Sequence, residues 1–322
     1  MGIRYLNTYM KSKCNRGIKN ISLKDLSGCS LAIDISIYMY RYEIEGKLLE
    51  NTISLINMLL SYNITPIFVF DGKPPDEKTD TLNMRKERRR EASNKCDELL
   101  DKISSGNAED CDISNYERLK QDATRITREK VNNIKKIISG FNLIQYTACG
   151  EADELCAFLV LNGYCWGCVS DDMDMFVYGC NNIVRDVDIY TETAVAYNLV
   201  EILYELNINY QNFKQVCILA GTDYNNTSRK DSGHIINIYG IFKLYYRFMK
   251  KVKYNNMLFY DWLKHYIKYD VNYSVLYKIC DMFVLKDVEI PDTFINSCTT
   301  NKSITQLEPT DSYENYIINT YP

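Results

Sequence analysis

The chain has 322 residues, of which 46% are hydrophobic and 25% are charged, and its formal net charge is −4. This length and composition predict a soluble globular protein with one large domain or two smaller ones. No apolar run approaches the roughly 20 residues of a membrane-spanning helix, and the first residues lack the apolar segment of a secretory signal, which argues against a membrane partner. The 12 cysteines are therefore expected to be reduced thiols.

Two apolar segments near the start of the chain predict neighbouring strands. Residues 30–40 begin with a β-branched apolar run, and residues 63–72 contain a continuous apolar run at 67–70. Continuous apolarity is typical of a strand that is buried on both faces of a parallel sheet. Residues 48–62, which lie between them, have helical spacing, so the region predicts a β-α-β unit.

A long charged region follows this unit. Residues 78–100 and 116–139 predict two charged helices joined by a loop over 104–115. Further strands are predicted at 142–147 and 165–169, further helices at 151–164, 198–206 and 210–221, and a helical region past 225. The predicted fold is α/β, with a largely parallel central sheet flanked by helices, a charged helical insertion and a helical C-terminal region.

Seven carboxylates fall at the ends of these strands and helices. They are Asp34, Asp71, Glu151, Asp153, Asp172, Asp174 and Asp223. Because the carboxyl ends of parallel strands meet at one edge of a sheet, all seven could converge on one crevice. Clustered carboxylates repel one another unless cations lie between them, and sets of oxygen ligands suit Mg²⁺ or Mn²⁺. Each acid alone also fits a turn or a helix start.

Other kinds of catalytic site are poorly supported. The chain has only two histidines, His234 and His265, and both lie outside the acidic set. The one CxxC pair, Cys165 and Cys168, has no second pair at zinc-site spacing and is predicted to be buried in a strand. The remaining chemistry for the acidic set is hydrolysis of a phosphodiester by two metal ions.

Two basic residues follow Asp71 on one helix face, at Lys78 and Arg85. A basic face beside metal ions could grip a phosphate. Acids are interleaved with these bases, at Glu77 and Glu87 for example, so the same spacing also fits a solvated charged helix.

Six motifs in a fixed order resemble the XPG-type flap endonuclease family of structure-specific 5′ nucleases, and most of all a poxvirus member. The motifs are "MGI", "AIDIS", "FVFDGKPP", "GEADE", "SDDMD" and "AGTDY", within roughly residues 1–250. The resemblance implies a PIN-like 5′ nuclease fold. It also implies a nuclease core over residues 1–224 with a helical arch at about 78–139, a helical DNA-binding region over 225–302 and a tail over 303–322.

The same resemblance implies a role for each site residue. The seven carboxylates would bind two Mg²⁺ ions, or Mn²⁺ in their place, and Asp153 stands where the family commonly has Glu. Lys78 and Arg85 would act in catalysis by engaging the scissile phosphate. Tyr40 would stack on a base beside the cut, and Gly2 would lie near the metal ions.

One motif departs from the family pattern. The family has a Gly-hydrophobic-Gly turn in a helix–two-turn–helix element that contacts duplex phosphates and a potassium ion. Here Gly240 remains as a DNA-binding candidate, but Phe242 occupies the second glycine position. A bulky side chain there is expected to hinder close approach of the DNA backbone. This leaves duplex and potassium binding open.

The sequence therefore predicts a Mg²⁺-dependent DNA endonuclease and 5′ exonuclease that acts on branched or 5′-flap DNA. Its expected setting is viral replication, recombination and double-strand break repair in the host cytoplasm, and no sliding-clamp motif is seen. A junction resolvase or an RNase with the same chemistry is an alternative. A catalytically weak scaffold that binds DNA is a further alternative. An acidic cluster without a catalytic use would destabilise the fold by self-repulsion, which argues against this alternative.

Overall fold

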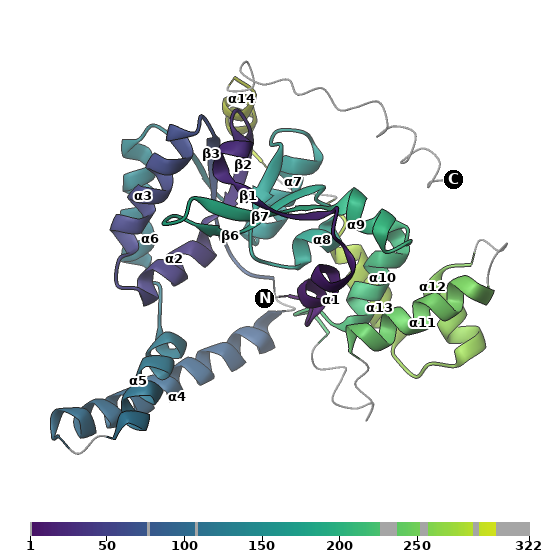
Figure 1. Ribbon diagram of the computed structural model, residues 1–322, viewed down its shortest axis with the longest axis horizontal. Coiled ribbons are helices and arrows are strands. Elements are labelled where there is room, and N and C mark those ends of the chain that lie inside the picture. Colours follow the sequence, from purple (N-terminus) through teal and green to yellow (C-terminus); the bar gives the residue numbers. More distant parts are fainter. Residues whose placement is uncertain are drawn as a thin grey trace.

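The central element of the protein is a seven-stranded sheet. A computed structural model describes residues 2–75, 78–106, 109–225, 237–251, 257–285 and 290–300 (Figure 1). Within these residues the strand order is β1-β7-β6-β5-β2-β3-β4. The strands are β1 (Ile18–Ser22), β2 (Ser30–Asp34), β3 (Thr65–Phe70), β4 (Ile144–Thr147), β5 (Gly167–Val169), β6 (Asn182–Asp188) and β7 (Thr193–Asn198).

Five neighbouring strands of this sheet, from β4 through β3, β2 and β5 to β6, run parallel. Strand β7 is antiparallel to both β6 and β1, which forms the far edge. The predicted largely parallel α/β sheet is confirmed. The chain leaves β2 toward β3 on one side and later returns to pair β5 on the other side. Ligand sites in such sheets form at this reversal of strand order, beyond the carboxyl ends of the strands.

Helices cover both faces of the sheet and form a separate C-terminal group. They are α1 (Leu6–Lys13), η1 (Leu23–Leu26), α2 (Ile35–Ile44), α3 (Leu48–Ser61), α4 (Thr79–Ser104), α5 (Asp110–Ala123), α6 (Arg128–Gly140), α7 (Ala152–Leu161), α8 (Asp174–Tyr178), α9 (Leu199–Glu205), α10 (Tyr210–Ala220), α11 (Ile238–Lys251), α12 (Phe259–Trp262), η3 (Leu263–Ile267), α13 (Tyr273–Met282) and α14 (Asp292–Thr300). None of the helices in the described residues is long and apolar enough to cross a bilayer.

Alternation along the central strands builds two hydrophobic cores. In β2, Leu31 and Ile33 face the core that α2, α3 and α6 complete. Between them, Ala32 faces the opposite core, to which α7 and α10 contribute. Both faces of the central strand are thus buried, as the continuous apolar pattern predicted.

The charged insertion differs from its predicted form. The expected loop over 104–115 is wrong in part, because α5 begins at Asp110, and the expected helix over 116–139 is two helices broken at 124–127. Helices α4 and α5 pack against each other and project away from the sheet (Figure 1). Helix α6 instead packs on α3 and buries Ile134 and Ile138 in the core.

The C-terminal helices attach to the sheet through aromatic residues. The ring of Phe242 in α11 stacks on that of Tyr9 in α1, with centroids 4.1 Å apart. The expectation that Phe242 obstructs DNA at the surface is therefore wrong, because its side chain is 1% exposed. Its helical spacing from Ile238 and Tyr245 places it on the apolar face of α11. At the other end of the sheet, Phe294 of α14 packs on Tyr146 of β4.

Candidate metal centre

The ends of β2 and β3 place two carboxylates beside one serine. Asp34 is the last residue of β2 and the N-cap of α2, and its Oδ1 accepts the Ser36 N–H at 3.1 Å. Asp71 directly follows β3, and its Oδ2 accepts the Ser36 hydroxyl at 2.5 Å. Ser36 therefore bridges the two acids and fixes their separation.

The turn between β5 and α8 brings two more carboxylates to the same edge. The Ser170 hydroxyl donates to Asp34 Oδ2 at 3.3 Å and accepts the N–H of Asp172 at 3.2 Å. Asp172 Oδ1 in turn accepts the N–H of Asp174, the first residue of α8, at 3.0 Å. The chain of contacts links the carboxyl end of β5 to that of its neighbour β2.

Helix α7 adds its acids from its first turn. Glu151 is the N-cap of α7 and Asp153 follows in the first turn. The N–H of Ala152, between them, donates to Asp71 Oδ1 at 2.9 Å. The N-terminal end of α7, where the helix dipole is positive, thus faces Asp71.

Repulsion among the acids shows in their pKa values. Burial, followed by the charges of Asp71 and Asp172, raises the pKa of Asp34 to about 8. Burial and the charge of Asp172 also raise the pKa of Asp153 and of Asp174 well above the usual range. Asp223 and Glu151 add to the effect on Asp174. All seven predicted acids therefore belong to one interacting cluster.

The cluster has the chemical character of a cation site. Asp174 is 2% exposed, and its Oδ1 finds no hydrogen-bond partner among the described residues. Leaving a buried carboxylate oxygen unpaired is costly, and a hard cation would satisfy it. Gly2 packs against the cluster near the N-terminus: with a φ of 72°, it lies so near Asp172 and Asp174 that a Cβ would overlap both carboxylates. The residues present therefore fit Mg²⁺ or Mn²⁺.

The start of α4 supplies positive charge to this cluster. Lys78, the N-cap of α4, is 7% exposed, and its Nζ lies 2.6 Å from Glu151 Oε2. The Tyr224 hydroxyl donates to the same oxygen at 3.0 Å, and Lys78 Nζ lies 4.7 Å from the centre of the Tyr224 ring. Burial alone would lower the pKa of Lys78, but Tyr224 and Glu151 outweigh it and raise that pKa.

Two turns further along α4, Arg85 pairs with the last acid of the set. Its Nη2 lies 2.7 Å from Asp223 Oδ2, while the Thr81 hydroxyl donates to the Asp223 carbonyl at 3.2 Å. Lys78, Thr81 and Arg85 thus form one face of α4 that contacts the acidic cluster. The spacing of the two bases predicted the shared face, and the alternative of a solvated charged helix is wrong for this face.

These contacts also hold the acids apart. Among the residues that the structure describes, no three Asp, Glu, His or Cys side chains already stand in a geometry that holds a metal ion. Lys78 and Arg85 hold Glu151 and Asp223, and Ser36 holds Asp71. A cation therefore needs side chains of the cluster to turn toward it.

The remaining predicted residues lie in two other places. Tyr40 is on α2 with 38% exposure, and its hydroxyl accepts a hydrogen bond from Arg89 of α4 at 3.4 Å. Gly240 is in the first turn of α11, and its N–H donates to Asn237 Oδ1 at 3.1 Å. Gly240 is not among the residues that contact the acidic cluster in the described structure, and its role in DNA binding stays a prediction.

Two family models match the chain at the segments that build this centre. The XPG N-terminal domain matches residues 1–92, and the XPG I-region matches residues 142–223. Together they cover more than half of the chain and all seven acids. The chain belongs to the XPG-type flap endonuclease family.

Relatives within the XPG family are flap endonucleases of cellular organisms. Flap endonuclease 1 of Theileria annulata is 31% identical over 245 residues, which are 70% of this chain and 47% of that protein. Flap endonuclease 1 of Entamoeba dispar is 30% identical over 246 residues, which are 70% of this chain and 63% of that protein. The chain spans about half of the Theileria relative and less than two thirds of the Entamoeba one.

Solved structures show that the fold is that of the XPG family. The catalytic core of Rad2 in complex with a DNA substrate matches with a TM-score of 0.60 at 19% identity, over 100% of both chains. Flap endonuclease-1 from Methanococcus jannaschii matches with a TM-score of 0.58 at 22% identity, over 89% of this chain and 86% of that one. Human GEN1 in complex with Holliday junction DNA matches with a TM-score of 0.58 at 16% identity, over 94% of this chain and 73% of that one.

Sequence reasoning missed the neutral residues that position the acids of this XPG-family chain. Ser36 contacts the carboxylates of Asp34 and Asp71, Ser170 joins the Asp34 carboxylate to the N–H of Asp172, and Tyr224 joins Lys78 to Glu151. All three lie inside or directly beside family motifs, in "AIDIS", "SDDMD" and "GTDY". Their position next to each acid was therefore a usable signal.

Proposed function

We propose that this chain is a divalent-metal-dependent, structure-specific endonuclease that hydrolyses phosphodiesters in branched or 5′-ended DNA. The observation that carries the proposal is the meeting of seven carboxylates, from β2, β3, α7, the β5–α8 turn and the end of α10, under the basic face of α4. Acids of this number around a buried unpaired carboxylate oxygen suit hard cations.

In this proposal the acids hold two Mg²⁺ ions, or Mn²⁺ in their place. Bound ions would activate water and stabilise the negative charge that develops on the phosphate. The acids that the structure buries most deeply, Asp34, Asp172 and Asp174, form the inner part of the centre. Glu151, Asp153, Asp71 and Asp223 complete it from the surrounding helix and loop ends.

Lys78 and Arg85 have a second role here, which is to bind the phosphate. Their present partners are Glu151 and Asp223. Cations that take up these carboxylates would free the two basic side chains for the anionic substrate. The ammonium and guanidinium groups then orient the phosphate above the acids, since charge-assisted hydrogen bonds to phosphate oxygens are strong and directional.

The proposed substrate follows from the basic helices and from the relatives. Residues 118–136 carry seven Lys or Arg side chains in α5, α6 and the segment between them: Arg118, Lys120, Arg125, Arg128, Lys130, Lys135 and Lys136. The Rad2 and GEN1 structures are DNA complexes, the latter with a Holliday junction. Binding through phosphate contacts should weaken steeply as salt rises, and a flat salt response would count against this surface.

The direct test compares the wild-type chain with the double variant Asp172→Ala, Asp174→Ala. Wild type with Mg²⁺ is expected to cut at least one member of a panel of nicked, 5′-flap, four-way-junction and RNA substrates. The double variant, and wild type with EDTA, should cut none of them. Equal cutting by both proteins would overturn the proposal, and the preferred member of the panel separates flap endonuclease, junction resolvase and RNase.

We propose that this activity serves viral DNA replication, recombination and double-strand break repair in the host cytoplasm. The poxvirus likeness of the sequence motifs is what supports this setting. Localisation of the tagged full-length chain in infected cells would test it, and an exclusively nuclear signal would contradict it.

A further inference from the structure

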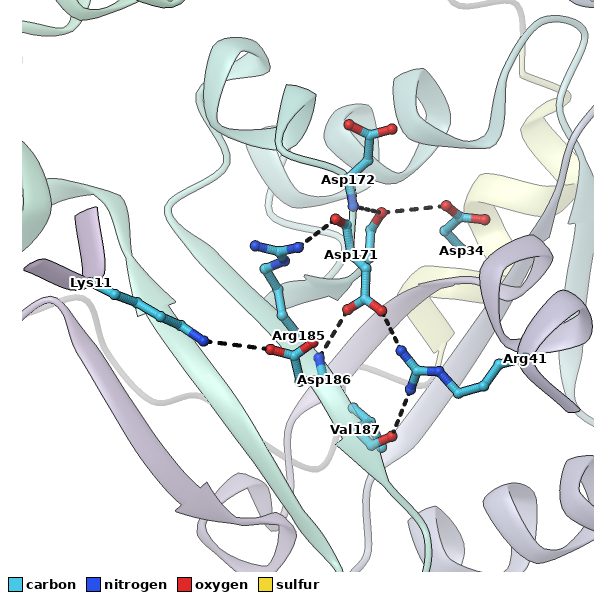
Figure 2. A network of polar contacts seen from close by, with 9 residues as sticks. Lys11, Asp34, Arg41, Asp171, Asp172, Arg185, Asp186 and Val187 are labelled. Atoms are coloured by element: carbon cyan, nitrogen blue, oxygen red, sulfur yellow. Dashed lines mark hydrogen bonds and ion pairs between the residues drawn. The ribbon is translucent and has the colours of Figure 1, made fainter. Parts of the chain in front are cut away.

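Asp171, the first acid of "SDDMD", lies at the centre of a polar network beside the candidate metal centre (Figure 2). Its Oδ2 accepts from Arg41 Nη2 at 2.6 Å, and its Oδ1 accepts the N–H of Asp186 at 2.9 Å. Arg41 also donates to the Val187 carbonyl at 3.2 Å. The network therefore joins α2, the β5–α8 turn and β6.

The contacts of Asp171 distinguish it from the acids on either side of the turn. Both of its oxygens already accept charged or backbone donors, and the residue is 9% exposed. Asp174 Oδ1, in contrast, is buried with no hydrogen-bond partner among the described residues. Since an oxygen that is bonded to a guanidinium is poorly placed to bind a second cation, Asp171 is not predicted to be a ligand.

The guanidinium group of Arg185 also contacts the β5–α8 turn. Arg185 is 6% exposed, and its Nη2 donates to the Asp171 carbonyl at 2.6 Å while its Nη1 contacts the sulfur of Met173. The residue held between these two contacts is Asp172. Arg185 thus holds the backbone before a proposed metal ligand and the side chain after it, while the Asp171 side chain ties the same turn to α2 and β6.

The β6 segment is shaped to make these contacts. Asp186 has a φ of 53°, in the left-handed region, at a point where the register of β6 against β7 shifts. This bulge turns the Asp186 N–H toward Asp171 and interrupts the pairing of the strand. A non-glycine residue in this conformation costs free energy, so the surrounding contacts must hold it there.

We propose that Asp171 is a positioning residue: clamped by Arg41 and by the β6 bulge, it sets where the Asp172 carboxylate lies relative to Asp34. The inference rests on the proposed function, because it concerns how a metal ligand is oriented. Residues that orient ligands in this way tune metal affinity without touching the ion.

The test measures Mn²⁺ binding by the full-length protein directly, from the electron paramagnetic resonance signal of free Mn²⁺. Asp171→Ala should raise the Mn²⁺ dissociation constant about tenfold. Asp171→Asn retains an oxygen for the Asp186 N–H but loses the charge that faces Arg41, so its Mn²⁺ dissociation constant should rise less than that of Asp171→Ala. Arg41→Met should raise the Mn²⁺ dissociation constant by about as much as Asp171→Asn does. The double variant Arg41→Met, Asp171→Asn should bind Mn²⁺ as well as either single variant, because both substitutions remove the same contact.

Two comparison variants make the result specific. Lys11→Met removes the 3.8 Å pair of Lys11 with Asp186, whose side chains are 44% and 47% exposed, and should leave Mn²⁺ binding unchanged. Asp172→Ala, which removes a proposed ligand, should weaken Mn²⁺ binding more than Asp171→Ala does. Cutting by Asp171→Ala should recover at high Mn²⁺, whereas cutting by Asp172→Ala should not.

A purely structural role for Asp171 predicts a different pattern. It would lower the thermal unfolding temperature of Asp171→Ala and leave the Mn²⁺ dissociation constant at the wild-type value, which would overturn the positioning role. A wild-type chain that binds no Mn²⁺ at all would overturn the proposed function together with this inference. Weaker Mn²⁺ binding by Asp171→Ala, with wild-type binding intact, would support both.

Discussion

The Lys78 ammonium group lies 2.6 Å from the Glu151 carboxylate, in a pair whose side chains are only 9% and 21% exposed. Tyr224 completes the contact by donating its hydroxyl to the same carboxylate oxygen. The start of α4 is thereby fixed against the start of α7, beside the acidic cluster. Removing one partner of such a pair leaves a poorly solvated charge behind.

Lys78→Ala is expected to lower the free energy of unfolding by about 2 kcal/mol, because it leaves the Glu151 carboxylate without its cation although the Tyr224 hydroxyl still donates to it, and to slow DNA cutting. Arg85→Ala is the matched comparison. The Arg85 side chain is 44% exposed in its pair with Asp223, so solvent screens the pair, and the expected loss of stability is at most ~1 kcal/mol. Urea unfolding and single-turnover cleavage measure the two effects. Equal losses of stability would contradict the distinction.

Gly2→Ala should weaken metal binding, because a Cβ at Gly2 would displace the carboxylates of Asp172 and Asp174. The Mg²⁺ concentration for half-maximal cutting is expected to rise about tenfold. Gly46→Ala is the control: its φ of 71° matches the 72° of Gly2, but a Cβ there meets no atom within 4 Å. Both variants share the backbone strain, so equal Mg²⁺ requirements would show that contact with the carboxylates is unimportant.

Phe242→Ala should destabilise the attachment of α11 to α1, because it removes a buried ring that stacks on Tyr9. The expected loss in the free energy of unfolding is about 3 kcal/mol. Met249→Ala, on the same helix with 38% exposure, should change it by no more than about 0.5 kcal/mol. Urea unfolding followed by tryptophan fluorescence reports on this region through Trp262. Similar stabilities of the two variants would contradict the packing role of Phe242.

Glu205 gives the fold a defined pH dependence. Its carboxylate accepts the N–H groups of Asn15, Arg16 and Gly17, and these bonds outweigh the effect of burial and lower its pKa. A lowered pKa in the folded state contributes stability above the unfolded-state pKa, and this contribution is lost as pH falls through the folded-state pKa.

Glu205→Gln is therefore expected to lower the free energy of unfolding by about 1 kcal/mol at pH 7. At acidic pH the difference from wild type should shrink, beginning near the unfolded-state pKa of about 4.3, and it should be lost as pH falls through the lowered folded-state pKa of Glu205. Glu201→Gln, an exposed position on the same helix, should show little effect at either pH. Urea unfolding at both pH values makes the comparison, and a pH-independent difference would count against the role of the charge.

The sequence was sufficient to predict the acidic cluster because six of its acids end or follow a strand or open a helix, and Asp223 follows the end of the apolar helix α10. That rule depends only on parallel strands sharing a carboxyl edge, and β2, β3 and β5 obey it. The face of α4 that contacts the cluster was also predictable, since Lys78 and Arg85 lie two helical turns apart. The pairing of Lys78 with Tyr224 was not, because the two are distant in the chain.

Other elements carried misleading local patterns. The segment that forms α2 follows the strand β2 without a break and has tyrosine at every second residue from 38 to 42, an alternation that obscures the helix that Asp34 caps. The β6–β7 hairpin lacks the Asn-Gly or Asp-Gly turn that marks most hairpins, and its bulge at Asp186 disturbs the period of two. Arg41 and Asp171 are 130 residues apart, and only the folded sheet brings them together.

The pairing of β2 with β5 joins segments that are more than 130 residues apart, and Asp223 comes later still. A ribosome that synthesises this chain must therefore release most of it before the inner acids can meet. Until then the nascent polypeptide carries Asp34 and Asp71 without the neighbours that complete the acidic cluster. A chain that ends before β5 therefore lacks Asp172, Asp174 and Asp223 and cannot assemble this cluster.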